Sequence, residues 1–493
     1  MTVPTVTGCA TELALTPGRR TMAMVVVALA FVMDLLDVTI VHVALPSIRA
    51  GVGAGAASLQ WMVAGYALTF AVGVITGGRL GDVFGYRRVF LVGVSAFTLA
   101  SLLCGLAMSP AQLVAARALQ GLSAALMVPQ VMALMQVMYA PDERLRVFAL
   151  FGLLGGASSA LGPVVGGMLI EADWWSLGWR LAFLVNAPVG LIAVVAGLCL
   201  LPAGSGACGK ALDLNGTLLV ALTLLALLLP LIQGPESGWP VWCGLSLSTV
   251  PLLAWGTVRA WATRQARDRS ALVDPALLRQ PSVRNGLLAT LALSGIVPSY
   301  LLAMTFIVQT GLGASPRDMA VLCMPIAAGA AVSVGVLSRH AVRWLGDRAI
   351  AVGAVIQGLG LLWAAAAASR LLALPDAAHA VDPELLGAHG LIGLGIGFIG
   401  PPLNVLTLRH VPLSEAGSAS GVIGATRQVA VALTLAGAGG LMFQGHAPPV
   451  GHAHLEQGLL RVLFALWSLL ALGAFIHTFN RPAASPPAQP TPH

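Results

Sequence analysis

Long apolar stretches are the feature that most constrains this chain of 493 residues. A transmembrane helix needs about 20 consecutive apolar residues, and breaks made by charged residues, Pro and Gly separate fourteen stretches of about that length. The predicted spans are 21–45, 59–78, 88–108, 112–138, 147–170, 181–201, 213–232, 241–261, 285–309, 318–338, 349–369, 386–408, 418–440 and 457–478. The sequence therefore predicts an all-α polytopic membrane protein.

The scarcity of charged residues excludes the soluble classes of protein. Charged residues make up 9% of the chain, whereas an average soluble domain carries about 25%. A soluble chain of this length would need several domains, each with a charged surface. Soluble enzymes and nucleic-acid-binding modules are therefore excluded, and the lipid bilayer is the expected surrounding. The net charge of +7 is explained by basic cytoplasmic loops rather than by a nucleic-acid partner.

The basic residues also predict the orientation of the chain. If the N-terminus is cytoplasmic, most of the 26 Lys and Arg residues fall on the inner side or in the cytoplasmic tails, as the positive-inside rule expects. The first span contains aspartates and is too long for a signal-peptide core, so we expect it to be retained. The basic residues predicted outside are Arg49, Arg180, Arg317, Arg370 and Arg461. We predict a multi-pass protein of the cell inner membrane with both ends cytoplasmic.

A loop pattern that recurs along the chain indicates an internal repeat. The segment Gly81–Arg88 follows the second span, and a degenerate echo, Arg343–Arg348, follows the tenth. Removing spans seven and eight makes these positions equivalent in two six-helix bundles, which is a known transporter plan. The predicted organisation is a cytoplasmic tail (1–20), an N-terminal bundle (21–201), two inserted linker helices (202–262), a cytoplasmic connector (263–284), a C-terminal bundle (285–478) and a cytoplasmic tail (479–493).

Few ionisable residues fall in the middle of predicted spans. Asp34 and Asp37 are three positions apart in span one and share a helix face. Because such carboxylates do not readily both ionise in a low dielectric, we expect at least one to hold a proton near neutral pH, an effect that a nearby Arg117 would oppose. A conformational change that separates Arg117 from a carboxylate would then couple to a proton. The alternative is a static buried ion pair, or for Asp34 a structural hydrogen bond.

Other residues near these charges are weaker candidates. His42 lies nearer the outer end of span one, and its imidazole titrates near neutral pH, which suits a proton-entry step; a neutral, hydrogen-bonded histidine is the alternative. Asp34 could also attract a cationic substrate, and neighbouring side chains could line a cavity, although core packing is their ordinary role. The residues predicted to contact substrate are Asp34, Trp61, Tyr66, Gln120, Met127 and Arg427.

Small residues in span five predict close helix packing. Gly162 and Pro163 lie in a run rich in Gly; small residues let a neighbouring helix approach, and Pro introduces a kink. Both a moving hinge, as alternating access requires, and tight static packing remain open.

Several strings together resemble the major facilitator superfamily, specifically its fourteen-span drug–proton antiporter branch. Leu36–Pro46 is similar to the branch's span-one signature, with His42 where Asn is usual, and Gly77–Arg88 resembles the superfamily loop motif. The resemblance covers nearly the whole chain. The other matching strings are Ala116–Gly121, Gly162-Pro163, Trp179–Gly190 and Gly417–Gln428.

The resemblance implies roles for particular residues. Asp37 would take the coupling proton, and Arg117 would take part in its transfer. The departure at His42 affects the outer end of the proton path. The residues implied to form an inner gate that changes between states are Arg79, Asp82, Arg87 and Arg88, and Gly162 and Pro163 correspond to the antiporter motif.

The predicted function is a proton-coupled antiporter, working as a monomer, that exports amphipathic drugs or antibiotics across the inner membrane by alternating access. Alternatives are a dedicated exporter of an endogenous metabolite or self-made antibiotic, and a proton-independent uniporter. We expect no enzymatic activity, because HExxH, GxSxG and a clustered carboxylate array are not found in the sequence. We also expect no cofactor and no metal, since none of the six cysteines forms a CxxC.

Overall fold

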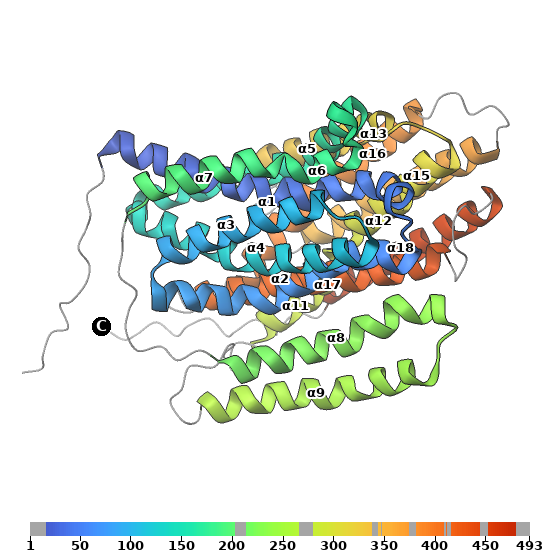
Figure 1. Ribbon diagram of the computed structural model, residues 1–493. Helices are drawn as coiled ribbons and strands as arrows, with labels where there is room; N and C mark the ends of the chain where they lie inside the picture. Colours follow the sequence, from blue (N-terminus) through green and yellow to red (C-terminus); the bar gives the residue numbers. More distant parts are fainter. Residues whose placement is uncertain are drawn as a thin grey trace, which may run out of the picture.

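The computed structural model describes residues 16–202, 213–265, 280–337, 344–346, 348–373, 381–408, 411, 416–443 and 452–479. The described residues form helices and no β-strand, and the helices run roughly parallel to one another (Figure 1). The predicted tails and the connector 263–284 lie largely outside the described residues, so the domain boundaries stay predictions.

The first half of the chain consists of α1 (Pro17–Val52), α2 (Ala56–Phe84), α3 (Tyr86–Gly105), α4 (Pro110–Met138), α5 (Pro141–Ala172), the turns η1 (Trp174–Ser176) and η2 (Gly178–Arg180), α6 (Leu181–Leu184) and α7 (Asn186–Leu200). An inserted hairpin follows, made of α8 (Leu214–Ser237) and α9 (Val241–Gln265). The second half consists of α11 (Pro281–Leu293), α12 (Ile296–Thr305), η3 (Phe306–Gly311), α13 (Pro316–Val332), η4 (Ser333–Leu337), α15 (Arg348–Ala373), α16 (Pro383–Leu408), α17 (Ala416–Phe443) and α18 (His452–Phe479).

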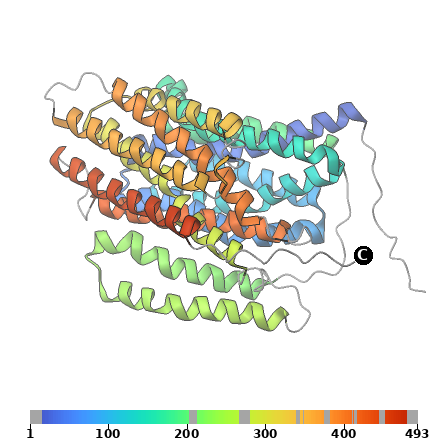
Figure 2. The ribbon, with the colours of Figure 1, turned by 180° about the vertical axis from the view of Figure 1, so that it is seen from behind.

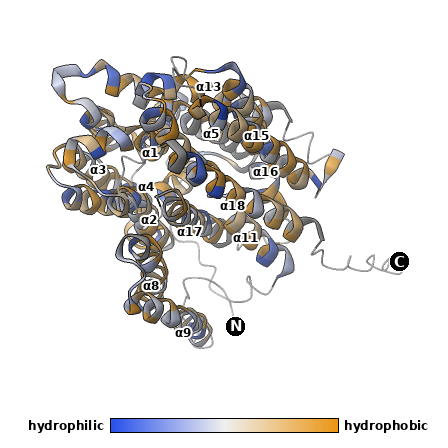
Figure 3. Ribbon diagram, turned by 90° about the vertical axis from the view of Figure 1, so that its right-hand side faces the viewer, coloured by the Kyte–Doolittle hydropathy of each residue, from blue (hydrophilic) through white to orange (hydrophobic). Residues whose placement is uncertain are grey.

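The lengths and composition of these helices confirm a polytopic membrane protein. Within the described parts of the chain, 13 helices are long and apolar enough to cross a membrane. The remaining predicted span, 147–170, falls within α5, whose described apolar segment is the shorter Leu161–Ala172. Apolar residues predominate along the helices in Figure 3.

Local sequence explains where many helices begin. Proline is favoured in the first turn because its missing N–H would lack an intrahelical partner there. Ser109 caps α4 by accepting a hydrogen bond from the backbone N–H of Gln112 at 3.3 Å. Ser315 and Asp318 cap α13 reciprocally, each accepting from the other's backbone N–H at 3.2 and 3.0 Å. The prolines that open helices are Pro17, Pro110, Pro141, Pro281, Pro316 and Pro383.

The predicted span 285–309 is interrupted in the structure. The span 285–309 is divided into α11 and α12 at Ser294 and Gly295, and it ends in the π-helix η3. A Cβ atom at Gly295 would meet the hydroxyl of Thr434 and the backbone of Ala430 in α17, so glycine is required for this close approach. Hydropathy does not predict this break, because apolar residues continue on both sides of it.

The two halves of the chain repeat one another in detail. In the first half, α2 packs on α4, and Gly121 of α4 meets the backbone of Tyr66 in α2. In the second half, α13 packs on α16, and Gly393 of α16 meets the backbone of Ile326 in α13. The loops that follow α2 and η4 each contain a glycine with positive φ, Gly85 and Gly346. These recurring contacts support the internal repeat predicted from the sequence.

The inserted hairpin lies along one side of the bundle, where α8 packs on α2 and α17 while α9 contacts α8 (Figures 1 and 2). A shared apolar cluster holds α8 in place, with Ala64 and Leu68 from α2, Leu228 from α8 and Ala432 and Ala436 from α17. The hairpin is therefore an addition beside the two halves and does not separate them.

Buried side chains join the two halves at one end of the molecule. We call this the outer end, following the predicted orientation; it holds the turn at Gly53 between α1 and α2. There, one apolar cluster combines Val43 and Leu59 of the first half with Phe306 of the second, and Gln309 Nε2 donates to the carbonyl of Val43 at 3.0 Å. Toward the inner end, the first half has a separate cluster of its own, on which Ala425 of α17 packs. The halves are therefore closed together at the outer end.

Candidate functional site

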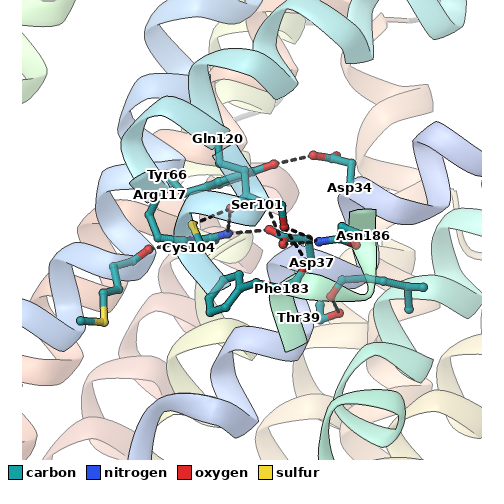
Figure 4. Close-up of polar contacts among 12 residues, drawn as sticks. Asp34, Asp37, Thr39, Tyr66, Ser101, Cys104, Arg117, Gln120, Phe183 and Asn186 are labelled. Carbon is teal, nitrogen blue, oxygen red and sulfur yellow. Dashed lines mark hydrogen bonds and ion pairs between the residues drawn. The ribbon is translucent and has the colours of Figure 1, made fainter. Parts of the chain in front are cut away.

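A buried carboxylate lies at the centre of the first half. Asp37 of α1 is fully buried, and both of its oxygens accept hydrogen bonds (Figure 4). Arg117 Nη1 donates to Oδ2 at 2.5 Å, and the amides of Gln120 and Asn186 each donate to Oδ1 at 2.8 Å. The ion pair is therefore buried away from solvent, so water cannot replace either charged partner if the other is removed.

The arginine of this pair is held from several sides. Arg117 of α4 is 1% exposed. Its Nε donates to the carbonyl of Met62 in α2 at 3.0 Å, and its Nη1 also donates to Gln120 Oε1 at 2.7 Å. The Tyr66 ring lies 4.4 Å from its Cζ, close enough for a favourable cation–π contact. Helices α1, α2 and α4 are thus tied together through one guanidinium group.

The second carboxyl of α1 joins the same network. Asp34 is nearly buried, and its Oδ1 accepts a hydrogen bond from the hydroxyl of Tyr66. Tyr66 therefore contacts Asp34 through its hydroxyl and Arg117 through its ring (Figure 4). Asp34 and Asp37 therefore share one site. The Tyr66 side chain connects them, because it contacts Asp34 directly and also contacts Arg117, the partner of Asp37.

Asn186 and Ser101 belong to this site but were not among the predicted site residues. Asn186 begins α7, where the helical segment of α6 is interrupted at Val185. Its amide donates to Asp37 and also to Ser101 Oγ of α3, at 3.0 Å, and Ser101 in turn donates to the carbonyl of Phe183. The signal that could have found Asn186 is an amide side chain inside an apolar span, which needs a buried partner.

We expect Asn186→Ala to weaken both the fold and the site. The change removes the donor that Asp37 Oδ1 and Ser101 Oγ share. Gln120 still donates to Oδ1, but the buried Ser101 oxygen loses its donor, and an unsatisfied buried acceptor costs about 1–3 kcal/mol. The purified variant should melt several degrees lower in detergent. Asn215→Ala, at an exposed asparagine near the start of α8, should melt like the parent protein. Equal melting of both variants would show that Asn186 does not hold Asp37.

The other predicted site residues lie elsewhere. His42 is buried, and its Nδ1 has no hydrogen-bond partner among the described residues. Met127 is fully buried in the apolar cluster of the first half, and Trp61 packs on the cluster between α2, α8 and α17. The packing of Met127 and Trp61 is that of core residues, so their contact with a substrate stays a prediction.

The predicted gate residues lie at the inner end, around the turn at Gly85 between α2 and α3. Asp82 accepts a hydrogen bond from the hydroxyl of Tyr86 at 2.9 Å. Arg87 donates to the carbonyl of Leu198 in α7. Arg79 is half-buried in α2, and Arg88 is exposed at the start of α3. These residues lie at or near this turn, and their action as a gate stays a prediction.

The predicted hinge lies where α5 meets α1. A Cβ atom at Gly162 would overlap the side chain of Thr39, and one at Gly166 would lie 3.0 Å from Ile40. On its other side, α5 meets α13, where Gly167 lies against Pro316. Pro163 lies inside the helix, which continues through it. The glycines allow the predicted close approach, and movement about Pro163 stays a prediction.

The second half holds a neutral counterpart of the ion pair. Tyr300 of α12 and His389 of α16 are fully buried and hydrogen-bonded at 2.6 Å, and His389 Nδ1 lies 2.6 Å from the carbonyl of Leu322 in α13. Because a carbonyl only accepts, Nδ1 carries the proton and Nε2 accepts from Tyr300. By these contacts His389 corresponds to Arg117, Leu322 to Met62 and Tyr300 to Asp37. The two halves thus share the position of this contact but not its charge.

Arg427 lies apart from the ion pair, within the span of α17. Its side chain is exposed, and its guanidinium donates to Asn404 Oδ1 of α16 at 3.2 Å. Across the residues that the structure describes, there is no group of three His, Cys, Asp or Glu side chains that could hold a metal ion.

The sequence is similar to those of known proteins along most of its length. The sequence pattern of the Major Facilitator Superfamily matches residues 27–435. The chain is 36% identical over 462 residues to a "Probable actinorhodin transporter" of Streptomyces coelicolor, covering 93% of this chain and 78% of that protein. It is 37% identical over 426 residues to the "Puromycin resistance protein pur8" of Streptomyces alboniger, covering 85% and 81%.

A solved structure shows the same fold. The inward-facing, unoccupied structure of a bacterial homolog of the human lysosomal transporter Spinster superposes with a TM-score of 0.61. The superposition covers 96% of this chain and 100% of the Spinster homolog, and the two sequences are 15% identical.

Proposed function

The chain belongs to the Major Facilitator Superfamily, and we propose that it is a proton-coupled antiporter that exports antibiotics or other amphipathic drugs across the inner membrane. It is a multi-pass membrane protein of a transporter family rather than an enzyme. The single observation that carries the proton coupling is the buried pair of Asp37 and Arg117. The relatives named for actinorhodin and puromycin support an antibiotic as the cargo.

The geometry of the pair supplies a coupling mechanism. Protonating Asp37 while Arg117 remains beside it would leave the arginine as an uncompensated buried charge, which is strongly unfavourable. Protonation is therefore favourable only in a conformation that moves Arg117 away or lets water reach it. Because Arg117 is bound to the carbonyl of Met62 in α2, such a movement changes the packing of α2 and α4 against α1. Protonation of Asp37 and movement of α2 and α4 relative to α1 are thus coupled.

Packing between the halves supports alternating access. The halves share a large apolar cluster at the outer end, whereas toward the inner end most apolar residues of the first half pack among themselves, with Ala425 of α17 against them. The close contacts of α5 with α13 and of α2 with α17 are the surfaces that would slide when the outer end opens. In this proposal Gly162 and Pro163 permit that sliding, and the residues around Gly85 close the inner end. We retain the predicted division of the chain into a bundle of six helices, an inserted pair of helices and a second bundle of six helices.

Asp34 is proposed as a second proton-binding group rather than a contact for a cationic drug. It is nearly buried and already accepts from Tyr66, so a substrate would have to displace that hydroxyl. His42 is retained as a candidate for the outer end of the proton path, since it is buried with an unpaired nitrogen.

We expect Asp34→Asn to export more slowly than the parent protein but to remain proton-coupled. The amide oxygen can still accept from Tyr66, so the fold should be preserved, while the proton-binding group is lost. The measurement is drug accumulation in everted membrane vesicles with an imposed pH gradient. Complete loss of gradient-driven transport in this variant would instead make Asp34 the essential proton carrier.

Dedicated export of one metabolite or self-made antibiotic is the alternative, and both relatives described above are named for a single compound. The deciding experiment expresses the protein in an efflux-deficient bacterium and measures resistance to a panel that includes puromycin, actinorhodin and unrelated cationic and neutral drugs. Resistance to many compounds supports multidrug export, and resistance to one supports a dedicated exporter. Transport in vesicles that ignores the pH gradient would contradict proton coupling and favour a uniporter.

A further inference from the structure

We propose that the space between α16 and α17 binds the negatively charged end of the exported molecule, and that the substrate is therefore an amphipathic organic anion. Arg427 and Asn404 supply the hydrogen-bonding groups. Gly400 and Gly424, which have no side chains, leave space for a ligand beside them. The inference rests on the proposed function, because it takes the exported molecule as the occupant.

Arg427 lies within a span and has no ionised partner among the described residues. A cation inside a span costs several kcal/mol and is retained for a reason of function or pairing. Among the described residues, its hydrogen-bond partner is the neutral amide of Asn404, at 3.2 Å. A guanidinium has five N–H donors, so most of these donors have no partner among the residues that the structure describes.

Arg117 provides the contrast. It is almost fully buried and donates to a carboxylate, an amide and a backbone carbonyl, with a tyrosine ring over its face. It is neutralised by Asp37 and cannot bind a ligand without losing that partner. Arg117 and Arg427 are thus in opposite states: Arg117 is ion-paired and enclosed, whereas Arg427 is exposed and has no ionised partner among the described residues.

The direction of the Arg427 side chain places it inside the protein. Ala432 and Ala436, on the opposite face of α17, pack against α2 and α8. Arg427 instead reaches toward α16, where it contacts Asn404. Asn404 lies four residues before Leu408, the last residue of α16, and Arg427 lies five residues after Val422, where the apolar part of α17 begins, so the pair lies within both spans, toward one end of them.

There is room for a ligand beside this pair. Gly424 lies one helical turn before Arg427, and Gly400 lies one turn before Asn404. A Cβ atom at either glycine would meet nothing within 4 Å, whereas many other glycines of the bundle lie against a neighbouring helix. The open space therefore extends along both helices from the two polar side chains.

These features select the chemistry of the occupant. An unpaired guanidinium in a low dielectric favours a carboxylate, phenolate or similar oxygen anion, because charge-assisted hydrogen bonds are the strongest of their kind. Asn404 can donate its own amide N–H to the same group. The rest of the molecule would lie against glycine and apolar side chains, so the substrate combines one acidic end with an apolar body.

The test is direct binding by the full-length protein in nanodiscs of zwitterionic lipid, so that no anionic headgroup competes. The probes are the fluorescent anthracene-9-carboxylate, its neutral methyl ester and 9-(aminomethyl)anthracene, which share one apolar body. We expect the acid to bind about tenfold more tightly than the ester, and the amine to bind weakest, as one charge-assisted hydrogen-bonded contact implies. Equal binding of acid and ester, or no binding of the acid, overturns the proposal.

Variants then locate the site. R427Q should raise the Kd of the acid about tenfold and change that of the ester less than about twofold, and R427K should fall between. Arg461→Gln, at another arginine within a span that contacts Gln457, is the matched control and should change neither Kd. Gly424→Leu should weaken all three probes by filling the space. An R427Q variant that binds acid and ester as the parent does overturns the assignment.

This experiment is independent of proton coupling. If the acid binds through Arg427 but gradient-driven transport fails in vesicles, the proposed function is wrong while the binding site stands. If antibiotics are exported in exchange for protons but R427Q leaves binding of the acid unchanged, the function stands and the anion site is wrong.

Discussion

Asp37→Asn is expected to abolish export driven by a pH gradient, reducing it to the level of membranes that lack the protein. Asparagine has the shape of the protonated acid, and its oxygen can still accept from Gln120 and Asn186, which now bind Oδ1. Its NH₂ group cannot release a proton, so the change from paired to unpaired Arg117 no longer depends on pH. Drug accumulation in everted vesicles, with and without an uncoupler, measures the loss.

A control separates loss of coupling from loss of fold. Removing one partner of a buried ion pair costs about 3–5 kcal/mol, so the variant should melt at a lower temperature. The double variant Asp37→Asn/Arg117→Gln removes both charges and should recover part of the stability without recovering coupled export. Exchange of labelled for unlabelled drug across the membrane should persist in Asp37→Asn, since it needs no proton. Uncoupler-sensitive export by either variant would rule out Asp37 as the proton carrier.

Gly77→Leu is expected to prevent accumulation of folded protein. A Cβ atom at Gly77 in α2 would overlap the carbonyl of Ala125 in α4 and lie 2.9 Å from its carbon, and backbone cannot move aside as a flexible side chain can. Overpacking of a core costs about 1–3 kcal/mol and sometimes more, and here it separates the two helices that hold Tyr66 and Arg117. Membrane abundance and melting temperature measure the effect.

The matched control for this change lies in the inserted hairpin. Gly256 of α9 is also a helical glycine, but a Cβ atom there would meet nothing within 4 Å. Gly256→Leu should therefore accumulate normally, and it should be slightly more stable because leucine favours helix more than glycine does. Normal accumulation of Gly77→Leu would mean that α2 and α4 can separate without loss of the fold.

Much of the fold followed from hydropathy because spanning a bilayer requires long apolar helices. The predicted span 112–138 corresponds closely to α4, whereas α1 extends from Pro17 to Val52, beyond the predicted 21–45. Hydropathy detects the part of a helix that crosses lipid, but helical structure continues into the polar ends. The break at Gly295 was invisible because it depends on a contact with α17.

The core of the site was also predictable, since Asp34, Asp37 and Arg117 are charged residues inside predicted spans, and their burial needs an explanation. The sequence could not show that Asn186 and Ser101 complete it, because their spans are far from span one along the chain. The carbonyl of Met62 carries no sequence signal at all. Aromatic and Met residues such as Trp61 and Met127 are ambiguous guides, because their size suits packing between helices, as the structure shows, as well as the lining of a cavity.

The pairing of Asp37 with Arg117 has a consequence for how the membrane potential acts on the carrier. The pair is electrically neutral while the carboxylate is ionised, and it carries a net positive charge once Asp37 is protonated. An electric field does work only on net charge that moves through it, about 2.3 kcal/mol per elementary charge for each 100 mV. An interior-negative voltage should therefore accelerate the half-cycle in which the proton-loaded carrier returns, and leave the movement of the ionised pair itself almost unaffected.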